Sequence, residues 1–343
     1  MAQNKNSALL QAYCSQAMLP QISALRKSAG NILRRKNVED IHDIRVASRR
    51  VRTCLSIFSD FMPSKKRKTW VQDIRSITQS YGHIRDLDVQ IELLTSLLKK
   101  PEHKSHIAGM RRMRLRLRQK KAKDESKTKA LTSEILESPA LLEMQAWAES
   151  KAADYDFKDT QSIILFQTAY SQIQSRLDEF LFFEVFIFDP ERISELHQMR
   201  IAAKHLRYAL EIFSDLYSGK IDFALDISRK IQQTLGEIHD ADMWASTLPK
   251  FLIKEKDRFA HFYGYSSLFN HLKPGVEFLM SNRKFERDHL YKQFINDWKR
   301  WKIKETWLNL RKVTFLTSLE QQNLRGLSDE TSESGEIQNH DSQ

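Results

Sequence analysis

One basic helical segment occurs twice in this chain, and the repeat constrains the fold more than any other feature. The first copy spans 41–61 and opens I-H-D-I-R-V-A-S-R-R-V-R, and the second spans 196–216 and opens L-H-Q-M-R-I-A-A-K-H-L-R. Four cationic positions align at a constant offset: His42 with His197, Arg45 with Arg200, Arg49 with Lys204 and Arg52 with Arg207. Their separations of three, four and three residues place them on one stripe of an α-helix. Cations on one stripe repel each other, so the duplicated stripe predicts a polyanion that lies along it.

A second motif is also duplicated, and it extends the repeat downstream. It reads G-H-I-R-D-L-D from Gly82 and G-E-I-H-D-A-D from Gly236, and an arginine lies seven positions before each glycine, at Arg75 and Arg229. A period of about 155 residues is too long for a solenoid repeat. We interpret it as a duplicated half of the chain, in which each glycine motif forms a turn.

Apolar residues recur at helical spacing along most of the chain, which holds only nine glycines and seven prolines. This periodicity predicts eight long helices, four in each half, over 7–36, 39–61, 64–99, 102–152, 160–183, 190–217, 220–247 and 254–315, with a break in the last one near Pro274. Long helices with short connections are typical of bundles. The predicted fold is therefore all-α, with two pseudo-symmetric four-helix bundles of long antiparallel helices around a basic central cavity. Residues 1–153 form the first half, 154–318 the second, and 319–343 an acidic, disordered tail.

Prolines help to place the predicted helix ends. Six of them fall near such ends, where a missing N–H group is harmless: Pro63, Pro101, Pro139, Pro190, Pro249 and Pro274. We expect Pro190 in the first turn of the helix that carries His197, with Asp189 as its N-cap. Pro20 is expected to kink or split the first helix. The apolar stretch 180–188 is too short to span a bilayer and is expected to be buried.

Charge and cysteine content restrict the partner and the compartment. The net charge is +11, although the last eighteen residues contain five acids and neither lysine nor arginine. Such a charge predicts a polyanionic partner. Cys14 and Cys54 have no metal-binding or redox spacing, which favours a reducing compartment. Residues 1–10 have no apolar core or cleavage signature, so we expect no signal peptide, and we predict a cytoplasmic protein without membrane association.

Each half also contains a second basic element. In the segment 106–123, Arg111, Arg114, Arg118 and Lys121 again follow separations of three, four and three, and Arg112 and Arg116 form a neighbouring row. The expected counterpart in the second half contains Arg283, Lys284 and Arg287. If the halves pack pseudo-symmetrically, the four stripes could line one groove or channel.

The sequence resembles the CHAD family, the conserved-histidine α-helical domain, over roughly residues 7–315. The resemblance lies in His42-x-x-Arg45-x-x-x-Arg49-Arg50-x-Arg52, in its second copy from His197 to Tyr208, and in the two glycine motifs. It implies two four-helix bundles around a basic cavity that binds inorganic polyphosphate. His239 departs from the family pattern, which has an arginine there. Some CHAD proteins carry an additional triphosphate-processing domain with a Glu-x-Glu-x-Lys motif; that motif is absent here, so we expect no enzymatic activity.

The stripes and the resemblance together predict a polyphosphate site without metal or cofactor. Its residues are His42, Arg45, Arg49, Arg50, Arg52, Arg75, Arg111, Arg114, Arg118, Lys121, His197, Arg200, Lys204, His205, Arg207, Arg229, Arg283 and Arg287. Arginine offers a planar fork that can bridge two phosphate oxygens, and lysine offers a point charge. The expected partner is inorganic polyphosphate, free or in granules; no oligomeric state is predicted.

Alternatives remain open at the level of sequence. A nucleic-acid-binding protein, in particular an RNA-binding one, would explain the charge, but we find neither a recognised RNA-binding signature nor aromatic residues assigned to the surface. A metal-dependent phosphohydrolase would use the pairs His42–Asp43 and His239–Asp240, which the duplicate positions do not preserve. Four aspartates could bind metal, but are better interpreted as helix caps or partners of arginines: Asp86, Asp88, Asp240 and Asp242. His42 and His197 could equally be capping or core histidines.

Overall fold

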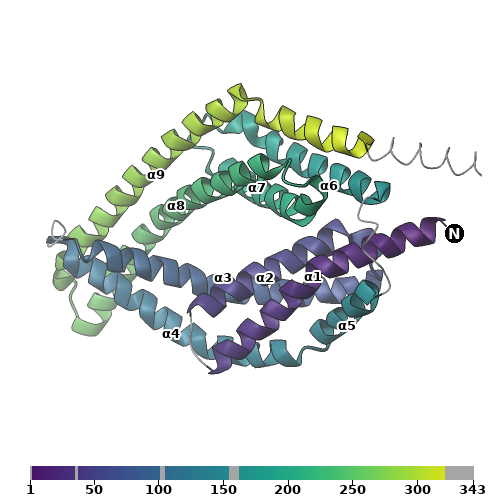
Figure 1. Cartoon of the computed structure of the whole chain (residues 1–343). Coiled ribbons are helices and arrows are strands. Elements are labelled where there is room, and N and C mark those ends of the chain that lie inside the picture. The colour runs from purple at the N-terminus through teal and green to yellow at the C-terminus, as the bar shows by residue number, and fades with distance from the viewer. Residues whose placement is uncertain (1, 35–37, 101–104, 154–161, 321–343) are drawn as a thin grey trace, which may run out of the picture. The chain divides into compact units, whose positions relative to one another are not determined.

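The computed structural model describes residues 2–34, 38–100, 105–153 and 162–320, and all regular structure within these ranges is helical (Figure 1). The first five α-helices are α1 (Ala2–Arg34), α2 (Val38–Ile57), α3 (Ser64–Leu97), α4 (Ile107–Glu137) and α5 (Pro139–Ala153). They are followed by α6 (Ile163–Leu181), α7 (Ile193–Phe213), α8 (Asp222–Tyr263), α9 (Lys273–Ile303) and a last helical segment over 306–320. Short 3₁₀ turns are η1 (Ser59–Phe61), η4 (Phe182–Phe186), η5 (Ser214–Tyr217) and η6 (Ser267–His271). The all-α prediction is confirmed. The predicted acidic tail beyond residue 320 lies outside the described residues.

Two of the predicted helices are divided in the structure. Two prolines lie inside helices instead of at helix ends. The helix predicted over 102–152 is interrupted between α4 and α5, where Pro139 is the first residue of α5. The helix predicted over 254–315 is represented by the end of α8, by α9 and by the segment 306–320. Pro249 lies inside α8, so the predicted end at 247 is wrong, and Pro20 lies inside an unsplit α1. A proline costs a helix interior about 3 kcal/mol, and buried neighbours such as Leu248 offset that cost by packing.

The described residues form two compact units. The larger unit contains 11–153 and 236–292, and the smaller unit contains the described parts of 1–10, 154–235 and 293–343. Both α8 and α9 therefore contribute residues to each unit. This division follows spatial contacts, whereas the predicted halves 1–153 and 154–318 follow the duplication, and those halves remain a prediction.

In the larger unit, α4 and α9 approach each other at two glycines. A Cβ atom built on Gly109 would lie 2.9 Å from the Cα of Gly275, and one built on Gly275 would lie 2.9 Å from the Cα of Gly109. The His106 ring stacks on Phe278 beside this contact, with ring centroids 4.6 Å apart. A hydrophobic cluster from α3, α4, α8 and α9 surrounds the crossing; its buried members include Leu94, Met110, Met113, Leu248, Val276 and Leu279. Only glycine at both positions permits this approach of two helix backbones.

In the smaller unit, large aromatic side chains fill the core. The Phe180 ring lies edge-on to Trp298 and Trp307, with centroid distances of 5.6 and 5.2 Å. The stretch 180–188 is only partly buried, contrary to the prediction, because Phe182 and Val185 are 68% and 75% exposed. The 3₁₀ turn η4 follows α6 directly and turns these side chains away from the helix's buried face. The mostly apolar sequence of 180–188 did not indicate that turn.

Two further findings concern the hydropathy of the helices and the state of the cysteines. None of the described helices is both long enough and apolar enough to cross a membrane. Cys14 on α1 and Cys54 on α2 are buried free thiols of the larger unit. Burial raises the pKa of Cys54 to about 12, which keeps the thiol protonated and unreactive at neutral pH.

Candidate anion-binding site

Helix α2 presents its cationic stripe beside a buried apolar stripe. Ile44, Val51 and Leu55 are completely buried in the larger unit, so the adjacent stripe faces outward. His42 is exposed and is the fifth residue of α2, one turn beyond the helix start where free N–H groups lie. Arg45 Nη2 lies 3.7 Å from Asp86 Oδ1 on α3, so that aspartate contacts an arginine of the stripe.

Further along the same stripe, the arginines meet no carboxylate. The Nε atom of Arg49 is buried and has no hydrogen-bond partner. Arg52 has a lowered pKa, because it is partly buried and because the positive charge of Arg75 on α3 lies close by. Within the part of the chain that the structure describes, no carboxylate forms an ion pair with Arg49, Arg52 or Arg75. Arg52 and Arg75 therefore repel each other, and no described carboxylate pairs with either of them.

Helix α7 repeats the arrangement in the smaller unit. His197 is its fifth residue, and burial together with the charges of Arg200 and Lys204 lowers the pKa of His197. The Nε atom of Arg200 is buried without a hydrogen-bond partner. The predicted cap is wrong: α7 begins at Ile193, and the Asp189 side chain instead accepts a hydrogen bond from the backbone N–H of Glu191 before the helix.

The remaining predicted residues of the smaller unit are paired with acids. Glu211 Oε1 lies 3.4 Å from Arg207 Nε and 3.9 Å from Arg229 Nη2. His205 Nδ1 lies 3.2 Å from Glu179 Oε1. Burial nevertheless lowers the pKa of His205, because it outweighs the opposing effect of Glu179. In this unit, part of the predicted cationic surface is thus compensated by the protein itself.

On α4, three arginines of the second stripe gather without carboxylates. The pKa of Arg114 is lowered by partial burial and by the charges of Arg118 and Arg111. Arg114 Nη1 donates only a long hydrogen bond of 3.5 Å to Thr95 Oγ1, and neither Arg111 nor Arg118 forms an ion pair with any described carboxylate. The predicted 3-4-3 stripe therefore brings these guanidinium groups together in the structure.

The last basic residue of the stripe on α4 and its counterpart on α9 each bind an aspartate of a duplicated glycine motif. Lys121 Nζ lies 2.5 Å from Asp88 Oδ1, and Arg287 Nε lies 2.6 Å from Asp242 Oδ1. All four side chains are at most 21% exposed. These two aspartates thus have arginine or lysine partners, as the sequence favoured, and Lys121 and Arg287 are partly neutralised as phosphate ligands. Arg283 donates two hydrogen bonds to its neighbour Asn282, and the charge of Glu286 also acts on it.

The glycine motifs themselves are not turns. Gly82 lies inside α3 and Gly236 inside α8, so the predicted turns at these positions are wrong. A Cβ atom added to Gly82 would have no neighbour within 4 Å. Helix propensity loses only about 1 kcal/mol at a glycine, and packing on both sides of the motif overrides it.

Sequence reasoning missed a buried carboxylate that organises the neighbouring basic row. Glu255 on α8 is completely buried, and accepts hydrogen bonds from Arg112 Nε at 2.6 Å and Arg116 Nε at 2.7 Å. Arg258 donates a further one. Burial raises the pKa of Glu255, but the hydrogen bonds from Arg116, Arg112 and Arg258 outweigh it and the net pKa is lowered. Arg112 and Arg116 therefore tie α4 to α8 and are not free for an anion.

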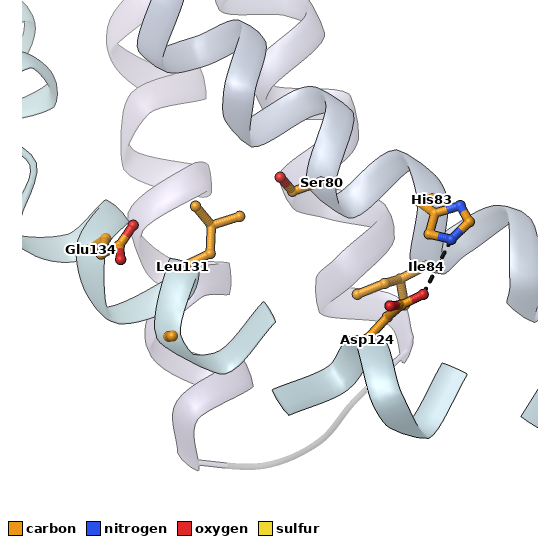
Figure 2. A pocket seen from close by; sticks show the side chains of 7 residues that line it. Ser80, His83, Ile84, Asp124, Leu131 and Glu134 are labelled. Carbon is orange, nitrogen blue, oxygen red and sulfur yellow. Dashed lines mark ion pairs between the residues drawn. The ribbon is translucent and has the colours of Figure 1, made fainter. Parts of the chain in front are cut away.

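A pocket between α3 and α4 was not predicted (Figure 2). Its volume is about 470 Å³, and its lining residues include Ser80, Ile84, Leu131 and Glu134. Figure 2 shows His83 and Asp124 facing each other across it, with Nε2 and Oδ2 3.2 Å apart. Two carboxylates against one histidine make this pocket unsuitable for a polyanion. Within the described ranges, no three His, Cys, Asp or Glu side chains gather as a metal ligand set, at His239–Asp240 or elsewhere.

The comparison with known families decides the identity of the chain. The family model of the CHAD domain matches residues 16–249, which include both copies of the basic helix and both glycine motifs. The chain belongs to the CHAD domain family.

Solved structures agree with a CHAD fold. The crystal structure of the CHAD domain from the plant Ricinus communis is similar with a TM-score of 0.54 and 21% sequence identity, over 83% of this chain and 86% of that one. PptA from Streptomyces chartreusis is similar with a TM-score of 0.54 and 13% identity, over 84% of this chain and 99% of that one. Among curated proteins, the comparison found no match. At these identities the similarity to solved structures concerns the fold alone.

Proposed function

We propose that this CHAD protein binds inorganic polyphosphate through its arginine stripes and catalyses no reaction on it. CHAD domains are known in general for binding polyphosphate, which gives the family argument. Polyphosphate presents about one negative charge per phosphate and no bases to read, so a binding surface needs closely spaced cations more than shape. We expect the protein to act in the cytoplasm, and the basic cavity common to both halves remains part of this proposal.

The observation that carries the proposal is the contrast among the predicted arginines. Some are bound to buried carboxylates, as Arg287 is to Asp242. Six others pair with no carboxylate of the described chain: Arg49, Arg52, Arg75, Arg111, Arg118 and Arg200. Two of them have a buried Nε without any hydrogen-bond partner, which costs free energy in the absence of an anion. A phosphate chain would satisfy these donors and relieve the repulsion between neighbouring arginines of one stripe.

The test is a binding titration with polyphosphate of defined length at several salt concentrations. We expect an affinity that falls steeply with salt, as for other polyanions that release counterions. Changing Arg49→Gln and Arg200→Gln together should weaken binding by about tenfold or more, because each removes a charge-assisted hydrogen bond. The matched control changes Lys68→Gln and Lys299→Gln, which are exposed and lie off the stripes. Equal losses in both double variants would contradict the assignment to the stripes.

Nucleic acid is the alternative ligand, and one structural observation favours it. Exposed aromatic rings, which the sequence did not place at the surface, lie at the end of α8 and just beyond it: Phe262, Tyr263 and Tyr265 are 77%, 57% and 53% exposed. Rings of this kind can stack on bases. We expect RNA to fail to displace polyphosphate; displacement at equal charge concentration would favour the nucleic-acid function.

The absence of catalysis is tested separately. We expect no phosphate release from polyphosphate in the presence of Mg²⁺ or Mn²⁺. Release that disappears in His239→Ala would instead support a metal-dependent phosphohydrolase.

A further inference from the structure

The two sequence copies carry the same arginine pair in different electrostatic surroundings. Arg52 on α2 aligns with Arg207 on α7, and Arg75 on α3 aligns with Arg229 on α8. In the smaller unit, Glu211 lies beside both arginines, with Oε1 3.4 Å from Arg207 Nε and 3.9 Å from Arg229 Nη2. One carboxylate therefore lies within ion-pair distance of both arginines, although the buried Nε atom of Arg207 forms no hydrogen bond.

A second acid adds to the compensation of this copy. Asp226 Oδ1 lies 2.9 Å from Arg229 Nη1, one helical turn away on α8. Arg207 and Glu211 are only 18% and 16% exposed, so water screens their contact weakly. Two arginines and two acids leave this local group without net charge.

The copy in the larger unit lacks both acids. Ser56 occupies the position of Glu211, and Gln72 occupies the position of Asp226. Helices α2 and α3, which carry Arg52 and Arg75, pack against each other, and the charge of Arg75 acts on Arg52. Neither arginine pairs with a carboxylate in the portion of the chain that is described. The same two arginines thus carry a net charge of two in one copy and none in the other.

We propose that Arg52 and Arg75 form a phosphate-binding subsite, and that Glu211 occupies the equivalent place in the second copy as an internal counter-ion. A carboxylate and a phosphate group each offer two anionic oxygens that can accept both N–H bonds of an arginine fork, so one can stand in for the other. This inference rests on the proposed function and sharpens it: the two copies contribute unequally to polyphosphate binding, and position 56 or 211 determines which copy is open.

The first experiment compares matched variants of the two copies in polyphosphate binding at low salt. Arg52→Gln should weaken binding by about two- to fivefold and reduce the salt slope by about one, whereas Arg207→Gln, which removes a cation already paired with Glu211, should have a clearly smaller effect on both. Exchanging the residues at positions 56 and 211 should reverse the relative contributions of the two copies: Ser56→Glu should weaken polyphosphate binding, and Glu211→Ser should strengthen it. Ser56→Gln introduces a side chain of the same size as glutamate but without its charge, and it serves as the control for Ser56→Glu. Equal effects of Arg52→Gln and Arg207→Gln would overturn the inference.

The second experiment uses inorganic pyrophosphate and thermal unfolding, so that it does not depend on polyphosphate binding. At low salt, Ser56→Glu should raise the melting temperature and reduce the further stabilisation by pyrophosphate. Glu211→Ser should lower the melting temperature, and pyrophosphate should restore it. Shifts of the same sign in both exchanges would overturn the subsite. If the wild type bound no polyphosphate while the exchanges behaved as expected, the proposed function would fail and the anion subsite would stand.

Discussion

Lys121 on α4 is held by Asp88 on α3 through an ion pair of 2.5 Å in which the aspartate is 9% exposed. The contact repeats between α9 and α8, where Arg287 lies 2.6 Å from Asp242. In both cases the base lies twelve positions after the glycine of the crossing, Gly109 or Gly275. Helices α4 and α9 thus have the same spacing between the glycine of the crossing and the base of the ion pair. This shared spacing supports a common origin by duplication.

Removing either aspartate should destabilise the larger unit. Asp88→Asn and Asp242→Asn each remove the mostly buried carboxylate that Lys121 or Arg287 binds, and we expect a loss of about 1–3 kcal/mol in the free energy of unfolding. Urea denaturation measures it. The double variant Asp88→Asn with Lys121→Met should recover part of the loss, because no unpaired charge remains. A single variant as stable as the wild type would show that the pair contributes nothing to the fold.

The glycine crossing makes a second stability prediction. Gly109→Ala places a methyl group 2.9 Å from the Cα of Gly275, where backbone cannot yield as a side chain could. We expect a net loss of about 1–3 kcal/mol from overpacking, although alanine favours the helix itself by about 1 kcal/mol. Gly82→Ala is the matched control, since its added Cβ has open space and should leave stability unchanged or raise it. Thermal unfolding of the two variants decides the matter; the same sign of change in both would contradict the crossing.

The stripes were predictable from sequence because helical spacing alone determines which side chains share a face. Arg111, Arg114 and Arg118 do gather on α4, and their mutual effect on the pKa of Arg114 follows from that spacing. Which cation is neutralised was not predictable in the same way. Lys121 and Asp88 are 33 positions apart on different helices, and their contact depends on how α3 and α4 pack.

Several local features could not be predicted from the sequence periodicity. Pro249 inside α8 and Gly82 inside α3 are residues that favour helix ends or turns, but tertiary packing outweighs their propensities. The exposure of Phe182 depends on the 3₁₀ turn η4, which continues α6. Hydropathy alone does not distinguish such a turn from a buried apolar segment. Glu255 did not stand out in the sequence, because only the packing of α4 on α8 places it among three arginines.

The buried Glu255 should make stability depend on acid pH. Its pKa is lowered in the folded protein below the ordinary value of 4.5, because the arginine hydrogen bonds outweigh burial. The charged form therefore stabilises the fold at pH values above the unfolded pKa, and this stabilisation is lost as pH falls through the folded pKa. Glu255→Gln should cost about 2–4 kcal/mol at pH 7 and should flatten the decline of melting temperature below about pH 4.5. An unchanged acid profile in the variant would exclude Glu255 as its source.

His197 should couple polyphosphate binding to pH. Burial and the charges of Arg200 and Lys204 lower its pKa in the free protein, so the ring is mostly neutral at pH 7. A bound polyanion would offset those charges and raise the pKa of His197, so that binding takes up a proton. Affinity should therefore rise as pH falls through the bound pKa and level off below the free pKa, with a slope of at most about tenfold per pH unit from this group. His197→Gln should reduce that slope, measured by titration between pH 8 and 5.5, while His261→Gln, an exposed histidine of the larger unit, should leave it unchanged. If both variants keep the wild-type slope, the proton is taken up elsewhere and His197 does not face the ligand.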